Sequence, residues 1–296
     1  MKLCLGTVQF GMEYGVQRAG KPSLTKALEM LEIAVVNGIT AFDTASAYGG
    51  AEVVIGEFLE RNTAIRSKIE LTSKLSPKAL DNHQKEHYNE AIRVDLIHSL
   101  KKLKTNYLDN YLLHNSAHID DSAAINALQR VKQEGLVRNI GASVYTPDEA
   151  KRGIERGLDI LQIPFSIFDR RMDEHGILSL AFNNNVKIQC RSIFTQGLML
   201  MDEKDIPQHL NKARPVVRQL TDFCKDHQIS RIQLAIAFVK MQTGISHIVF
   251  GVDNREQLFE IIEAYEQSIA SDLLFEASKT FSNLDENIIM PSKWKE

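Results

Sequence analysis

Four polar residues of the sequence carry side chains with complementary acid–base chemistry: Asp43, Tyr48, Lys74 and His114. A lysine ammonium beside a tyrosine stabilises the phenolate and lowers the pKa of the hydroxyl, which makes the tyrosine a usable proton donor. The Asp43 carboxylate would hold Lys74 charged and in place, and the His114 imidazole would hydrogen-bond a carbonyl oxygen. Such a set suits reduction of a carbonyl group. Because no side chain delivers hydride, the sequence predicts a nicotinamide cofactor.

Taken singly, each of these residues has an ordinary structural explanation. Asp43 is compatible with a loop cap, Tyr48 with a partly buried aromatic, and Lys74 with a solvated strand end. His114 is compatible with a core histidine bonded to backbone. Their positions favour a catalytic role. Asp43, Lys74 and His114 each end a short apolar run, and Tyr48 follows five residues after the run that ends at Asp43.

Short apolar or β-branched runs alternate with amphipathic stretches along the whole chain, a pattern typical of repeated βα units. The intervening stretches carry helical spacing, as in Leu24, Leu28, Leu31 and Val35. Eight runs are predicted strands: residues 3–8, 40–44, 69–73, 107–113, 139–143, 160–165, 187–192 and 248–252. Several are nearly continuous apolar runs, which is typical of parallel strands covered by helices on both faces.

Eight βα units predict an α/β protein with a closed (β/α)8 TIM barrel, with an open doubly wound sheet as the alternative. The chain has 296 residues, and no linker or change in composition divides it, so residues 1–296 are predicted to form a single domain. In a parallel barrel the C-terminal ends of the strands form one face, where active sites are built. The four polar residues are therefore expected to meet there.

Local signals support this division of the chain. Ser23 and Thr146 are predicted N-caps, the latter followed by Pro147 at the first helical position, and Gly38 is a predicted helix stop. Two polar stretches, residues 76–89 and 196–214, are predicted to be additional loops on the barrel.

Composition excludes several classes of function. Lysine and arginine total 35 against 38 aspartate and glutamate, a net charge of −3 without long blocks of one sign, so neither nucleic acid nor an anionic membrane is an expected partner. The apolar runs are too short for a membrane span, and the first residues lack the apolar core of a signal peptide. Cys4, Cys190 and Cys224 are widely spaced. A reduced, cytoplasmic setting and no metal site are expected.

Two motifs imitate binding sites. Residues 15–21 resemble a phosphate-binding loop, but Pro22 stands where the magnesium-binding hydroxyl belongs, so a plain loop is predicted. His83 and His87 match an inverted zinc-protease pattern, H-x-x-E-H. Their neighbours are polar, whereas a helix that supports a catalytic metal needs an apolar face. A solvated loop is the preferred interpretation, and a metal hydrolase is kept as a minor alternative.

A series of short motifs runs along nearly the whole chain in a fixed order. They are Leu5-Gly6-Thr7 with Phe10-Gly11, residues 38–45 with Tyr48-Gly49, Thr72-Ser73-Lys74, residues 109–114, residues 135–143, residues 161–164 and Gln257-Leu258. In these motifs the sequence resembles the aldo-keto reductase family. The resemblance implies a (β/α)8 barrel that binds NADPH, less often NADH, and reduces aldehydes or ketones. It implies that Tyr48 donates the proton, that Lys74 and Asp43 tune it, and that His114 orients the carbonyl.

The same resemblance implies a set of cofactor contacts: Thr7, Asp43, Ser143, Gln162, Arg191, Ser192, Gly197, Gly251, Arg255 and Gln257. Ser143 and Gln162 take the place of the family's ligands for the nicotinamide carboxamide, and Ser192 begins the loop beside the pyrophosphate. Arg191 stands where an aromatic residue commonly stacks on the nicotinamide. The chain departs from the family pattern at Val144 and Ile261, where asparagine is usual.

The adenosine end of the expected site leaves the choice of cofactor open. Arg255 is positioned in sequence to pair with a 2′-phosphate, which favours NADPH, although a solvated helix residue is an equal alternative. Asp253 is instead suited to accept a hydrogen bond from a free 2′-hydroxyl, which favours NADH. NADPH is the preferred prediction, with NADH possible.

The sequence as a whole predicts a monomeric or small homo-oligomeric carbonyl reductase that transfers hydride directly. Asn115, Ser116 and Arg170 near the predicted face favour a polar, sugar-like substrate. The departures at Val144, Arg191 and Ile261 motivate an alternative from a different class, a regulatory or partner subunit that binds the cofactor but has lost its catalysis.

Overall fold

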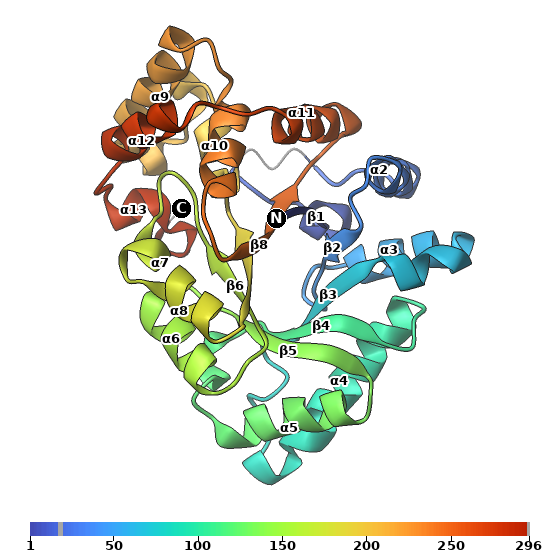
Figure 1. The fold of residues 1–296 in the computed structure, drawn as a ribbon. Coiled ribbons are helices and arrows are strands. Elements are labelled where there is room, and N and C mark those ends of the chain that lie inside the picture. The colour runs from blue at the N-terminus through green and yellow to red at the C-terminus, as the bar shows by residue number, and fades with distance from the viewer. Residues whose placement is uncertain (17–19, 295–296) are drawn as a thin grey trace.

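The computed structural model describes residues 1–16 and 20–294. Eight parallel strands follow one another in sequence order and close into a barrel, with helices around its outside (Figure 1). The strands are β1 (Lys2–Gly6), β2 (Ala41–Asp43), β3 (Glu70–Leu75), β4 (Leu108–Leu113), β5 (Val137–Ser143), β6 (Ile160–Pro164), β7 (Lys187–Arg191) and β8 (Ile245–Gly251). The predicted single (β/α)8 barrel is confirmed, and the open sheet is excluded.

The described residues also form thirteen α-helices, several of which bury apolar stripes against the barrel. They are α1 (Val8–Gly11), α2 (Leu24–Val36), α3 (Ala51–Arg61), α4 (Tyr88–Lys102), α5 (Ser122–Gln133), α6 (Pro147–Glu155), α7 (Arg171–Glu174), α8 (Ile177–Asn183), α9 (Arg214–Asp226), α10 (Arg231–Lys240), α11 (Arg255–Glu266), α12 (Ser271–Thr280) and α13 (Glu286–Ile289). Leu28 and Leu31 of the predicted first stripe are buried, as this packing requires. None of the described helices is both long and apolar enough to cross a membrane.

The predicted N-caps and the predicted glycine helix stop are present in the structure. The Ser23 hydroxyl accepts a hydrogen bond from the Lys26 backbone at 3.4 Å, and Thr146 forms a capping box with Glu149. Gly38 has a φ of +80°, the left-handed conformation in which glycine commonly ends a helix. The chain therefore turns into β2 at the place where the sequence predicts it.

The Thr146 cap allows a test of this local assignment. Replacing Thr146 with alanine is expected to lower the free energy of unfolding by about 1 kcal/mol, because the first turn of α6 loses an acceptor for its backbone N–H. Thr146→Ser keeps that acceptor and should retain most of the stability. Urea denaturation of the three proteins measures both values, and equal stabilities for all three would contradict the capping role.

The two predicted additional loops contain short helical turns. Residues 76–89 include the 3₁₀ turn η2 (Lys85–His87), and residues 196–214 include η4 (Thr195–Leu200), η5 (Glu203–Asp205) and η6 (Gln208–Ala213). His83 and His87 are exposed, and within residues 1–16 and 20–294 no three histidine, cysteine or acidic side chains are grouped to hold a metal. Within the segment 15–21 that resembles a phosphate-binding loop, residues 17–19 lie outside the described residues.

Candidate active site

A buried lysine occupies the centre of the site. Lys74 is fully buried at the end of β3, and its Nζ donates to Asp43 Oδ1 at 2.8 Å, to Asp43 Oδ2 at 2.9 Å and to the Thr44 carbonyl at 2.9 Å. The same ammonium lies 3.4 Å from the Tyr48 Oη. Because β2 and β3 are neighbouring parallel strands, their ends place the carboxylate and the ammonium together.

Tyr48 and His114 complete the group. Tyr48 lies in the turn between β2 and α3, which packs so closely on α1 that a Cβ on Gly11 would lie 1.7 Å from the Tyr48 carbonyl oxygen. His114 follows β4, and its ring meets the Tyr48 ring edge to face, with centroids 5.6 Å apart. The structure thus brings together all four residues that the sequence singles out.

Burial and the neighbouring polar groups together set the protonation of Tyr48 and Lys74. The pKa of Tyr48 is raised from its ordinary value because burial outweighs the opposing effect of the Lys74 ammonium. Lys74 lowers the pKa of the hydroxyl as expected, but the net shift is upward because the effect of burial is larger. Burial alone would lower the pKa of Lys74, but Asp43 and Tyr48 together raise it. The site therefore holds a protonated tyrosine beside a charged lysine at neutral pH.

His114 is neutral over the physiological range. Burial, then the positive charges of Lys74 and Arg191, lower the pKa of its imidazole to about 3. Its Nδ1 is buried without a hydrogen-bond partner among the described residues. A neutral imidazole carries one N–H donor, which is what orienting a carbonyl oxygen needs.

A chain of amide side chains inside the barrel holds the carboxylate of Asp43. The Gln162 Nε2 donates to Asp43 Oδ1 at 2.7 Å and to Gln189 Oε1 at 3.1 Å, and the Gln189 Nε2 donates to Thr72 Oγ1 at 3.0 Å. The roles of Gln189 and Thr72 were not predicted. The available signal was a glutamine between the apolar residues Ile188 and Cys190 of β7, at a position whose inward direction the register sets.

One long cleft begins at Asp43 and Tyr48 and runs across the C-terminal face to α10 and α11. Its volume is about 500 Å³, within the range typical of cofactor and small-molecule sites. Most of the predicted cofactor residues line it: Thr7, Asp43, Gln162, Arg191, Ser192, Gly197, Gly251 and Gln257. Tyr48 lies at its inner end, with Lys74 buried beneath.

Two predicted cofactor residues do not line this cleft. Ser143 is almost completely buried and pairs in register with Gln162 of the neighbouring strand. Arg255 is exposed, and its guanidinium forms ion pairs with Glu29 at 3.2 Å and with Glu256 at 2.9 Å. The solvated interpretation of Arg255 therefore agrees with its position.

Several residues that the sequence did not single out for the cofactor line the cleft. They are Gln9, Tyr14, Ser230, Arg231 and Glu260, and Asp253 lines it as well. The Arg231 guanidinium donates to the Met201 carbonyl and lies 3.8 Å from Asp202. A sequence signal that could have marked the segment of Arg231 is Ser230, an N-cap residue that forms a capping box with Gln233.

The far end of the cleft is suited to phosphate groups. The first turns of α10 and α11 line it, and helix N-termini attract anions through free backbone N–H groups and the helix dipole. The loop after β7 has positive φ angles at Ser192, Thr195 and Gln196, a costly conformation in residues other than glycine that is typical of functional sites. The Gln9 Oε1 is buried with no partner among the described residues. These features fit an extended dinucleotide.

Arg191, at the end of β7, contacts the segment that follows β5. Its guanidinium donates to the Val144 carbonyl at 3.0 Å and to Ser192 Oγ at 3.3 Å, and it lies 4.4 Å from the Tyr145 ring centre. Val144 itself is completely buried. The residue that departs from the family pattern at position 144 therefore contributes its backbone rather than its side chain.

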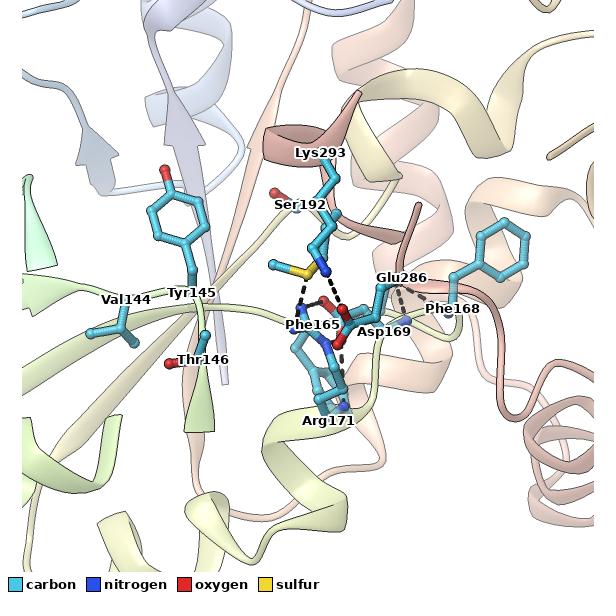
Figure 2. A network of polar contacts seen from close by, with 12 residues as sticks. Val144, Tyr145, Thr146, Phe165, Phe168, Asp169, Arg171, Ser192, Glu286 and Lys293 are labelled. Carbon is cyan, nitrogen blue, oxygen red and sulfur yellow. Dashed lines mark hydrogen bonds and ion pairs between the residues drawn. The ribbon is translucent and has the colours of Figure 1, made fainter. Parts of the chain in front are cut away.

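The segment after α12 lies beside the loops that carry Tyr145 and Ser192 and is held there by polar contacts. Figure 2 shows Arg171 against Asp169 in the loop after β6, with the Glu286 and Lys293 ion pair nearby. The Arg171 side chain bonds Asp169 at 2.7 Å and the Met290 sulfur at 3.2 Å. The chain beyond α12 is thus held to the same face of the barrel as Val144, Tyr145 and Ser192.

Comparison with known proteins places the chain in a family. The model of the aldo/keto reductase family matches residues 2–274, so the chain belongs to that family. Its members are oxidoreductases that use nicotinamide cofactors on small carbonyl compounds. The resemblance that the sequence motifs indicated is confirmed.

Its curated relatives are distant but of similar length. One is the uncharacterized oxidoreductase YqkF of Bacillus subtilis, 27% identical and matching 81% of this chain and 82% of the relative. Another is the NADH-specific methylglyoxal reductase of Escherichia coli, 27% identical over 77% of this chain and 78% of the enzyme. The crystal structure of PA4992 from Pseudomonas aeruginosa superposes with a TM-score of 0.67. The match covers 89% of this chain and 88% of the PA4992 chain. At 22% identity, that likeness bears on the fold alone.

Proposed function

We propose that this protein reduces an aldehyde or ketone to an alcohol by direct hydride transfer from a reduced nicotinamide cofactor, with Tyr48 as proton donor. The observation that carries the proposal is the placement of the Lys74 ammonium between Asp43 and Tyr48 Oη, at the inner end of a cleft of dinucleotide size. The family and the acid–base chemistry of these side chains support it.

Each residue has a distinct task in this reaction. When bound, the reduced nicotinamide supplies hydride to the carbonyl carbon. Tyr48 donates its hydroxyl proton to the carbonyl oxygen as negative charge develops there, and Lys74 stabilises the tyrosinate that remains. Asp43 keeps Lys74 charged and fixed. The neutral His114 orients the carbonyl oxygen through its N–H.

The direct test is a cofactor oxidation assay. Purified protein mixed with NADH or NADPH and a panel of small aldehydes and ketones should lose nicotinamide absorbance at 340 nm only when a carbonyl compound is present. Tight cofactor binding with no oxidation across the panel would instead favour the partner-subunit alternative that the departures at Val144, Arg191 and Ile261 motivated.

The substrate proposed is a small carbonyl compound, and a sugar-like substrate has less support than the sequence suggested. Ser116 bonds Glu149 at 2.9 Å, Arg170 bonds the Ser278 carbonyl at 2.8 Å, and Asn115 caps the turn at Ala117. These side chains already have partners within the protein. The named reaction of one relative, reduction of methylglyoxal, fits a small substrate.

For the cofactor, we propose a preference for NADH. The expectation of NADPH came from the family resemblance and from Arg255, which pairs with Glu29 and Glu256 away from the cleft. Asp253 and Glu260 line the cleft instead, and carboxylates repel a 2′-phosphate. The Escherichia coli methylglyoxal reductase, whose name states its cofactor, is NADH-specific.

Asp253→Asn should therefore tighten NADPH binding by about tenfold while changing the Kd for NADH little, because one repulsive charge is removed. Titration calorimetry with both cofactors measures the two values. Arg255→Gln is the matched control and should alter neither Kd. Selective weakening of NADPH by Arg255→Gln would overturn this account of cofactor choice.

A further inference from the structure

An arginine stands at the reacting end of the cleft, at the C-terminal end of β7. The Arg191 guanidinium is held by the Val144 carbonyl, by Ser192 Oγ and by the face of the Tyr145 ring. Tyr145 comes from the loop after β5 and Ser192 from the loop after β7 (Figure 2). Contacts on two sides fix the position of the charge, so it does not need to reorganise when a ligand enters.

Other charges at this end of the cleft cancel. Lys74 and Asp43 form a buried ion pair, Tyr48 is protonated, and His114 is neutral with a pKa of about 3. Within the described residues no acidic side chain forms an ion pair with Arg191. The inner end of the cleft therefore carries a net positive charge that comes from Arg191.

Hydride transfer sets two geometric requirements on the position of the nicotinamide ring. The carbonyl oxygen has to be within hydrogen-bond reach of Tyr48, and the hydride donor has to approach the carbonyl carbon to about 3–3.5 Å. The ring is thereby confined to the part of the cleft that Tyr48, Gln162 and Arg191 line together. The ring is neutral in the reduced cofactor and carries one positive charge in the oxidised cofactor.

We propose that Arg191 makes this cleft discriminate between the redox states of the cofactor, binding the reduced form more tightly than the oxidised form. The proposal rests on the proposed function. A fixed guanidinium repels the cationic ring and leaves the neutral ring unaffected, and in a partly buried cleft the difference amounts to about tenfold or more in Kd. The repulsion shifts the equilibrium among the bound species toward the reduced cofactor and the carbonyl compound, and it promotes release of the oxidised cofactor once the alcohol has formed.

The test compares equilibrium binding rather than turnover. Titration calorimetry measures the Kd of NADH and of NAD⁺ for the wild-type protein, Arg191→Met and Arg191→Lys. The ratio of the NAD⁺ value to the NADH value should be about tenfold or more in the wild type and in Arg191→Lys, and should fall several-fold in Arg191→Met. Arg191→Met should act mainly by tightening NAD⁺.

The matched control removes a guanidinium from the other end of the same cleft. Arg231→Met should weaken both forms by the same factor and leave the ratio unchanged, since both forms share the same adenosine and pyrophosphate. An unchanged ratio in a folded Arg191→Met protein would overturn the inference, as would an equally large loss in Arg191→Lys. Failure of the wild type to bind either form would instead count against the proposed function.

Discussion

Tyr48→Phe is expected to lower kcat by about 10²–10⁴-fold, the usual contribution of a positioned general acid, while the Kd of the cofactor stays within about twofold. The variant removes a single oxygen atom. The phenylalanine ring can still meet His114 edge to face, and Lys74 keeps both bonds to Asp43 and its bond to the Thr44 carbonyl. The loss is therefore chemical rather than structural.

A control variant separates this effect from a general disturbance. Tyr88→Phe also removes one phenolic oxygen from a buried tyrosine, but Tyr88 lies at the start of α4 and packs against His118 outside the cleft. It should retain activity within about twofold. If Tyr48→Phe keeps a tenth or more of the wild-type kcat, another group donates the proton and the proposed mechanism is wrong.

Lys74→Met is expected to reduce both stability and activity. The ammonium is fully buried, so its removal leaves the Asp43 carboxylate, itself 3% exposed, with the Gln162 amide as its one remaining side-chain donor among the described residues. Breaking a buried ion pair by removing one partner costs about 3–5 kcal/mol. Turnover should fall by about 100-fold or more, because no cation remains to stabilise the tyrosinate that forms when Tyr48 gives up its proton.

A double substitution distinguishes the two roles of the lysine. Asp43→Asn combined with Lys74→Met removes both charges, so most of the lost stability should return while turnover stays low. Thermal unfolding and steady-state kinetics on the wild type, the two single variants and the double variant complete the cycle. A double variant that recovers turnover would show that Lys74 serves the fold and not the reaction.

The features that sequence could predict are those set by local pattern. Parallel strands buried on both faces are recognisable as apolar runs, so β4 and β6 were located within a residue or two, whereas β8 begins earlier than predicted, at Ile245. Asp43, Lys74 and His114 were predicted to meet because the C-terminal ends of parallel strands in a closed barrel lie on one face.

The features that sequence could not predict depend on contacts between distant segments. The direction of Arg255 is set by Glu29, which lies on α2 at the other end of the chain. The bond between Gln162 and Gln189 follows from the register of β6 against β7. The pKa of Tyr48 rises although a lysine lies beside it, because the balance between burial and charge requires the packed structure.

The most direct measurement of the central claim follows the transferred hydride. NADH carrying two deuterium atoms at nicotinamide C4 is incubated with the protein and a reducible aldehyde, and the alcohol is analysed by mass spectrometry and NMR. Direct transfer predicts one deuterium on the carbinol carbon of every product molecule, and no product from Tyr48→Phe on the same timescale. Product without deuterium at that carbon, or deuterated product formed equally fast by Tyr48→Phe, would contradict the account.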